Sequence, residues 1–196
     1  MVSKRVPPLF IALLAGLAAV ALVISIGSNL GDNDQSTDVV LDEPGEYQQP
    51  GIPTNAPLAG TALENAVVID MAGNELDTAA LSDGRPMLIN FWFSNCQPCK
   101  REMPALQQAW ASYGDTVRFI GVNTQDSESI TRSFASDVGV EYELVRDPDG
   151  RFVTANGIAT FPTTLFVRAD GTIVEQVAGE ISIDDLTRAL SELMGA

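Results

Sequence analysis

Histidine is absent from this chain of 196 residues, and cysteine occurs only twice, at Cys96 and Cys99. Because histidine is the usual general base, metal ligand and activating partner of a cysteine, its absence removes most routes to acid–base or metal catalysis. A structural zinc site needs four Cys or His ligands, and this chain supplies two. The two thiols therefore favour thiol–disulfide exchange, and we expect neither a metal nor another cofactor.

Positive charge is also scarce, with 11 Lys and Arg against 26 Asp and Glu, for a net charge of −15. The stretch from Asp32 to Asp83 holds 11 of the acids and no Lys or Arg. Such a surface repels phosphate backbones, so we expect no nucleic-acid partner. The length suits one compact domain with appendages, and a hydrophobic content of 45% is enough for a buried core.

One long apolar run lies near the amino end, where residues 9–26 are interrupted only by Gly16 and Ser25. As a helix this run spans about 27 Å, close to the roughly 30 Å hydrocarbon core of a bilayer. We expect a transmembrane signal-anchor, with a cleaved signal peptide as the alternative. Lys4 and Arg5 precede the run, so the positive-inside rule places residues 1–8 in the cytoplasm. The remainder is then extracytoplasmic on a single-pass protein of the cell membrane, where disulfides persist.

Residues 27–60 carry four prolines and six acids without a helical or strand period, which indicates a solvated acidic linker. A plain tether is favoured over a docking segment. Residues 61–196 have the pattern of one globular domain, with a hairpin around Gly73. Strands are expected at 67–70, 75–76, 87–93, 117–123, 143–145, 163–168 and 172–178, and helices at 96–113, 127–138, 151–156 and from Ser182 as N-cap. This order predicts an α/β fold with a mixed central sheet flanked by helices on both faces.

The cysteines stand as Cys96-Gln97-Pro98-Cys99, after an apolar strand and at the expected start of a helix. Free N–H groups and the helix dipole stabilise a thiolate there, so Cys96 is expected to be the nucleophile. Cys99, one turn along, can resolve the mixed disulfide. A permanently closed structural disulfide is the alternative, although a loop this short gains little from cross-linking.

The segment from Asn90-Phe91-Trp92 through the cysteine pair to Glu102 and Pro104 resembles the thioredoxin-like family. It is most similar to the membrane-tethered TlpA/ResA branch of the AhpC/TSA-redoxin superfamily. The similarity covers about residues 61–194, including Gly121-Val122-Asn123, Asp149-Gly150 and Phe161-Pro162-Thr163. It implies a thioredoxin-like fold and an extracytoplasmic thiol–disulfide oxidoreductase that often reduces the haem-binding cysteines of apocytochrome c. Its expected partners are protein thiols and disulfides and a membrane redox protein that recycles the cysteines, and we expect a monomer.

The resemblance also implies the residues that contact substrate. Pro162 matches a cis-proline that faces the cysteines and lets Phe161 offer its backbone to a substrate strand. Trp92, Gln97 and Pro98 complete the expected substrate contacts, with core packing as the alternative for Trp92. Three residues depart from the family pattern, which puts the choice of partner in doubt: Phe93 and Asn95 before the first cysteine, and Thr160 where glycine is frequent.

Glu102 lies three residues after Cys99 and should share its helix face. In the matched branch an acid at this position relays the proton that thiol exchange requires. The alternative is a solvated carboxylate beside Lys100 and Arg101. Asn90 stands where thioredoxins themselves carry a buried acid, so that second proton route is expected to be absent.

Three further functions compete with reduction. An exported relative of the DsbE type can instead oxidise secreted proteins, and the Gln97-Pro98 pair does not decide the direction. A non-enzymatic, membrane-tethered binding module predicts that Cys96→Ala leaves function intact. A thiol peroxidase needs a Pro-x-x-x-Thr-x-x-Cys arrangement, which is missing because Ile89 and Phe93 occupy those places.

Overall fold

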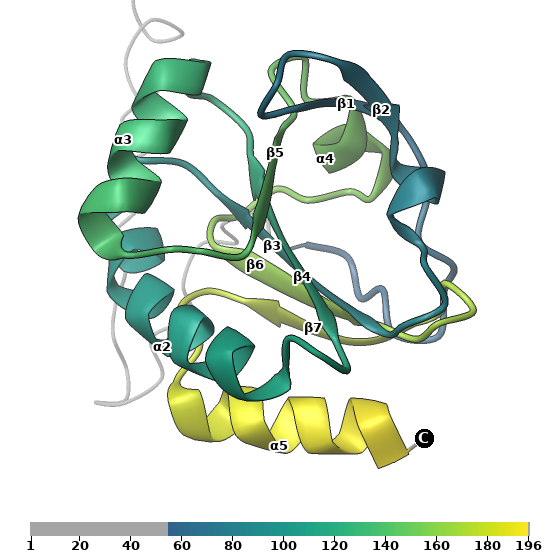
Figure 1. The fold of residues 1–196 in the computed structure, drawn as a ribbon. Helices are drawn as coiled ribbons and strands as arrows, with labels where there is room; N and C mark the ends of the chain where they lie inside the picture. Colours follow the sequence, from purple (N-terminus) through teal and green to yellow (C-terminus); the bar gives the residue numbers. More distant parts are fainter. Residues whose placement is uncertain (1–54, 196) are drawn as a thin grey trace, which may run out of the picture. The chain divides into compact units, whose positions relative to one another are not determined.

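The computed structural model describes residues 55–195, and Figure 1 shows their fold. Within these residues, seven strands form one sheet in the order β2-β1-β5-β4-β3-β6-β7. None of the helices in this part of the chain is long and apolar enough to cross a membrane. The expected cytoplasmic segment 1–8, the membrane span 9–26 and most of the linker lie outside the described residues.

The elements follow the expected order with shifts of one or two residues at their ends. The strands are β1 (Val67–Asp70), β2 (Glu75–Asp77), β3 (Met87–Trp92), β4 (Arg118–Asn123), β5 (Glu143–Arg146), β6 (Thr163–Val167) and β7 (Ile173–Ala178). The helices are the short 3-10 turn η1 (Thr78–Leu81), α2 (Gln97–Tyr113), α3 (Glu128–Val138), α4 (Arg151–Ala155) and α5 (Ile183–Gly195). The α/β class and the thioredoxin-like arrangement are therefore confirmed.

Strand β3 is an interior strand, which pairs in parallel with the central strand β4 and antiparallel with β6. All six of its residues are buried, because helices cover both faces of the sheet. Side chains alternate along a strand, so Ile89 and Phe91 pack into one core while Leu88 and Trp92 pack into the other. An apolar run without polar alternation, such as MLINFW, is what a strand in this position requires.

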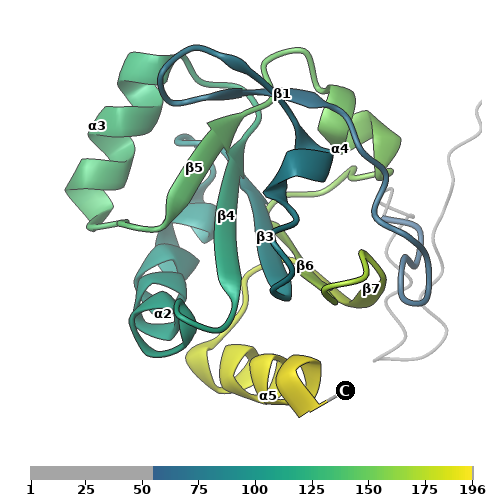
Figure 2. The ribbon, with the colours of Figure 1, turned by 45° about the vertical axis from the view of Figure 1, so that its right-hand side comes forward.

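The two cores correspond to the two faces of the sheet. Helices α2, α3 and α5 lie along one face, whereas α4 lies on the other, as Figures 1 and 2 show. On the first face the apolar stripes of α2 and α5 meet Leu88, Phe119 and Phe166. The cysteine pair belongs to this cluster, so the start of α2 is held by the core rather than by the loops around it.

The residues just before the expected domain boundary are bonded to the sheet. Gly60 N donates to Ile173 O over 2.8 Å, and Ile173 N donates to Thr61 O over 2.9 Å. Ala62 forms an antiparallel bridge with Thr172 on the same side of β7. Residues 55–60 were expected in the linker, whereas Gly60, the last of them, is bonded to β7.

Two expected helix features are present. Ser182 Oγ accepts a hydrogen bond from Asp185 N over 3.2 Å, which confirms Ser182 as the cap of α5. Helix α2 continues through Pro104 from Gln97 to Tyr113. Pro98 lies in its first turn, where a missing N–H costs no intrahelical bond.

Candidate active site

The cysteine pair forms a disulfide at the start of α2, directly after β3 and a short loop. Cys96 is the N-cap residue, and its Sγ accepts a hydrogen bond from Cys99 N over 3.2 Å. The exposed fraction is 5% for Cys96 and zero for Cys99. An external sulfur therefore reaches Cys96 first, and Cys99 reacts only through it.

An aspartate from the neighbouring strand end holds the loop before Cys96. Ser94 N and Ser94 Oγ each donate to the Asp126 carboxylate over 2.7 Å. Asn123 Nδ2 donates to the same carboxylate over 2.7 Å. Sequence reasoning missed Ser94 and Asp126, because nothing in the local pattern shows that the end of β4 meets the end of β3. Parallel pairing of these strands is what brings the two loops together.

Glu102 is buried beneath the cysteine pair, with an exposed fraction of 1%. Its Oε1 accepts from Asn90 Nδ2 over 2.8 Å and its Oε2 accepts from Ile181 N over 3.1 Å. Burial raises the pKa of Glu102 from 4.5 to about 7, opposed by these two hydrogen bonds and assisted by the nearby charge of Glu180. The solvated interpretation of this acid is therefore wrong, and its carboxyl is suited to exchanging a proton near neutral pH.

Asn90 can serve both protonation states of that acid. Its Nδ2 donates to Glu102 Oε1 and, over 3.0 Å, to Thr164 Oγ1. Among the described residues its buried Oδ1 has no hydrogen-bond partner. A half-turn of the amide would present that oxygen to a protonated Glu102, so the same side chain can donate to the carboxylate or accept from the acid.

A buried tyrosine shares the environment of this acid. Tyr142 Oη donates to Met103 Sδ over 3.1 Å. Burial raises the pKa of Tyr142, and the charge of Glu102 adds to the effect. The phenol therefore stays protonated at physiological pH. Sequence reasoning also missed this residue, which precedes β5 and is distant from the cysteines in the chain.

The segment before β6 meets the cysteine loop as the resemblance implies. The Phe161–Pro162 peptide bond is cis, and Pro162 is buried. The ring of Phe161 packs edge-on against Phe93, with 5.5 Å between ring centroids. Within residues 55–195 no hydrogen bond involves the backbone N–H or C=O of Phe161. That backbone is therefore free to pair with an extended partner. Phe93, which departs from the family pattern, contacts the ring of Phe161.

The expected substrate contacts separate into two groups. Gln97 is exposed and Pro98 is half-buried, so both border Cys96 at the surface. Trp92 has no exposed surface and stacks on Phe134 with ring centroids 5.1 Å apart. Trp92 is therefore a core residue and not a substrate contact. The alternation of β3 turns its side chain inward, which a motif match does not reveal.

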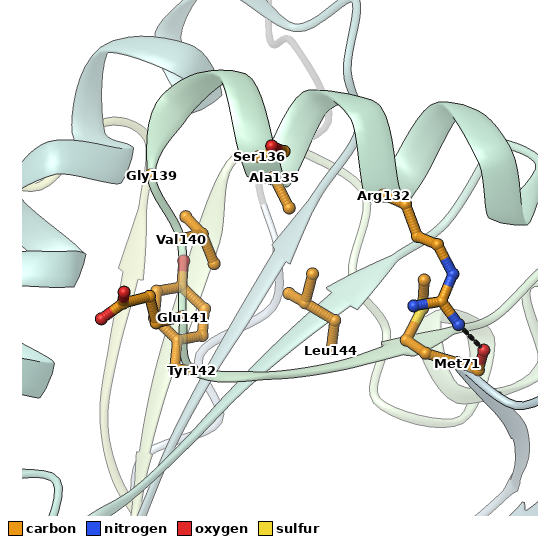
Figure 3. A pocket seen from close by; sticks show the side chains of 9 residues that line it. All are labelled: Met71, Arg132, Ala135, Ser136, Gly139, Val140, Glu141, Tyr142 and Leu144. Carbon is orange, nitrogen blue, oxygen red and sulfur yellow. Dashed lines mark hydrogen bonds between the residues drawn. The ribbon is translucent and has the colours of Figure 1, made fainter.

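A pocket of about 520 Å³ opens between α3 and β5, away from the cysteines. Figure 3 shows the Arg132 side chain reaching from α3 toward the Met71 carbonyl, with Leu144 and Tyr142 beneath the helix. The guanidinium is also paired with Glu128. Both of these partners belong to the domain itself. In the described part of the chain no cluster of three or more His, Cys, Asp or Glu side chains is arranged to hold a metal ion.

Comparisons with known proteins agree with this geometry. The model of the AhpC/TSA family matches residues 59–176. The thiol-disulfide oxidoreductase ResA of Bacillus thuringiensis (strain Al Hakam) is 26% identical over 135 residues, covering 68% of this chain and 78% of the relative. ResA of Halalkalibacterium halodurans is 31% identical over 122 residues, covering 62% and 69%. A secreted Mycobacterium tuberculosis disulfide oxidoreductase homologous to E. coli DsbE is 28% identical, with a TM-score of 0.59 over 65% of this chain and 96% of that one.

Proposed function

Because this chain belongs to the AhpC/TSA family as a thioredoxin-like thiol–disulfide oxidoreductase, we propose that it reduces disulfides of exported proteins. The observation that carries the proposal is the unequal burial of one bonded pair. Cys96 keeps an exposed fraction of 5%, whereas Cys99 has none and is followed one turn later by a buried acid. This asymmetry assigns a different role to each sulfur.

The reduced protein begins the reaction. The Cys96 thiolate attacks one sulfur of the substrate disulfide, forms a mixed disulfide and releases the other substrate sulfur as a thiolate. Cys99 then loses its proton to the Glu102 carboxylate and attacks the Cys96 sulfur. The Cys96–Cys99 bond closes, the second substrate sulfur leaves as a thiolate, and two electrons have passed to the substrate. A dithiol on a recycling protein must return those electrons before the next cycle.

The charges around the pair support the reducing direction. A strong oxidant of this fold is made by stabilising its reduced, thiolate form, which requires positive charge or hydrogen-bond donors near the sulfurs. The ionisable group buried on the Cys99 side of α2 is instead the acid Glu102, and the nearby Arg101 is paired with Glu180 over 2.7 Å. A carboxylate beside Cys99 disfavours a second negative charge on its sulfur, so the disulfide state is favoured and the dithiol gives up electrons readily.

For the substrate we propose apocytochrome c, whose haem-attachment motif Cys-x-x-Cys-His must be reduced before haem binds. Support comes from the TlpA/ResA-type residues at and around the cysteine pair. An extended segment carrying that motif fits the free backbone of Phe161. The same chain supplies both cysteines and Glu102, so a monomer is sufficient for the reaction.

We further propose that the domain acts on the extracytoplasmic side of the cell membrane, held there by residues 9–26. Lys4 and Arg5 before that apolar run support this orientation. A membrane redox protein on the same side would return the electrons. Protease added to intact cells or spheroplasts should remove the domain, whereas protection until lysis would contradict the orientation.

The decisive test is Cys99→Ser in living cells. The variant forms the mixed disulfide but cannot resolve it, so the substrate stays bound to Cys96 and is identified after gel separation without reductant. Capture of apocytochrome c supports the proposed substrate. The matched control Cys96→Ser should capture nothing. A binding module that does not use its thiols would give no trapped species in either variant and would retain its function in Cys96→Ala.

The reduction potential decides the direction of electron flow. A value well below about −200 mV supports reduction, and a value near about −120 mV, typical of a strong oxidant, supports the DsbE-like oxidase instead. Equilibration of the purified domain with glutathione or dithiothreitol buffers, read by thiol alkylation, gives the potential.

A further inference from the structure

Asn55 inserts its side chain beside the segment that precedes β6. It is buried, with an exposed fraction of 9%, although it comes from the region of sequence that resembles a linker. Its Oδ1 accepts three hydrogen bonds, from Ala159 N over 2.7 Å, Thr160 N over 3.0 Å and Thr160 Oγ1 over 3.1 Å. One amide oxygen therefore gathers two backbone donors and one hydroxyl from a segment more than 100 positions away.

The other end of the same amide reaches the far side of Phe161 and Pro162. Asn55 Nδ2 donates to Thr163 Oγ1 over 2.8 Å, and that hydroxyl donates to Thr160 O over 2.8 Å. The Asn55 side chain thus bonds to Thr160 before, and to Thr163 after, the pair Phe161 and Pro162. Thr160 is one of the departures from the family pattern, and its hydroxyl is used in this contact.

These bonds fix a backbone that has few other supports. Ala159 and Thr160 lie outside any helix or strand, so their N–H groups depend on Asn55 for a protein partner. A buried donor that loses its partner costs about 1 to 3 kcal/mol of free energy, so these bonds stabilise this one backbone conformation over others. A reacting group held in place also reacts faster, because misplacement by about 1 Å can lower a rate by roughly 100-fold.

We propose that Asn55 is a positioning residue for substrate binding, which holds residues 159–163 so that the Phe161 backbone faces a protein substrate next to Cys96. The inference rests on the proposed exchange reaction and adds a structural requirement to it. The end of the expected linker, residues 27–60, then contributes Asn55 to the substrate site and is not only a tether. Small disulfides, which do not pair with a backbone, do not need this positioning.

The first experiment compares two classes of substrate in Asn55→Ala. For a disulfide-containing peptide kcat/KM should fall about tenfold through KM, because the backbone to be paired is no longer fixed. With a small linear disulfide such as bis(2-hydroxyethyl) disulfide the rate should stay within twofold of the parent protein. The matched control is Thr61→Ala, which removes a hydroxyl bond to Leu58 O in the same segment without touching residues 159–163. Equal losses with both substrates, or no loss with the peptide, would overturn the proposal.

A second measurement does not depend on turnover. Amide hydrogen exchange at Ala159 and Thr160 should accelerate in Asn55→Ala and remain unchanged in Thr61→Ala, while exchange in β6 and β7 stays slow in both. Unchanged exchange at the two amides rejects the positioning role. If the parent protein reduces neither the peptide nor the small disulfide, the proposed function is wrong. The amide hydrogen-exchange rates still decide whether Asn55 fixes residues 159–163.

Discussion

Asn90 of the interior strand β3 and Glu102 of α2 are joined by a hydrogen bond of 2.8 Å, which ties the buried acid of the helix to the sheet. The position that holds a buried acid in thioredoxins is here an amide, and the acid stands on the facing helix. The proton route expected to be absent at Asn90 is replaced by a pair in which the amide supports the acid.

Glu102→Gln should slow the exchange reaction at neutral pH by about 100-fold or more, since a positioned general acid or base typically contributes about 10² to 10⁴-fold. The amide resembles the protonated acid, and Asn90 can turn its free Oδ1 toward it, so the fold should survive. The dependence of the rate on pH near 7, where the carboxyl titrates, should also disappear. Stopped-flow reduction of a model disulfide across pH 5 to 9 measures both effects.

The control for that variant is Glu75→Gln, an exposed acid on β2. It should keep the rate and the pH profile of the parent protein. If Glu102→Gln retains a pH profile like that of the control, Glu102 does not carry the proton and the relay must be sought elsewhere.

The stability of the oxidised protein should depend on pH through the same carboxyl. The pKa of Glu102 is raised from 4.5 to about 7 by folding, so between those values the native state holds a proton that the unfolded state has lost. The stabilisation is complete below pH 4.5, decreases as pH rises and is lost above about pH 7. The free energy of unfolding should fall by roughly 3 kcal/mol across this window from this group. Urea titrations at several pH values should show the decline in the parent protein, and Glu102→Gln should lack it.

Asn90→Asp should place two carboxyl groups within hydrogen-bond distance in a buried site. Two such groups share one proton because both cannot ionise readily, so they titrate as a pair and one stays protonated well above pH 7. The pH at which the exchange rate changes should therefore move upward by one unit or more. Carboxyl carbon chemical shifts followed by NMR would resolve the two steps. Asn74→Asp, in an exposed turn, is the matched control and should leave the profile unchanged.

Gly121→Ala should destabilise the domain without altering the cysteine pair directly. A Cβ atom at this position of β4 would lie 2.6 Å from Leu144 Cδ2 and 3.0 Å from Trp92 Nε1. The core on that face is tightly packed, so the extra methyl group should cost about 1 to 3 kcal/mol. Thermal unfolding measures the loss. Gly171→Ala is a poor control because its φ is +87°, whereas Gly195→Ala meets no atom within 4 Å and should be neutral.

The sequence was sufficient for the fold and for the cysteine pair because both depend on local patterns. Apolar strands, the cap at Ser182 and the Cys-x-x-Cys spacing each define an element within a few residues. The position of Glu102 on the helix was predicted, but its burial was not, because Ile181 and Asn90 reach it from distant segments. Asn55 and Asp126 could not be found from local patterns, since each acts on a loop that only the strand order brings near. For Trp92 both a substrate contact and core packing were predicted, and its complete burial agrees with core packing.

The pairing of Gly60, Thr61 and Leu63 with residues 171–173 affects where an unfolded polypeptide can bind to the sheet. In the proposed role the protein would work among exported polypeptides that have not finished folding, and these readily add a strand to any open sheet border. Residues 60–63 satisfy N–H and C=O groups along the start of β7, and the opposite border is the three-residue strand β2. Short or occupied borders discourage unfolded chains from adhering there, so the proposed binding beside Cys96 has less competition from these two borders.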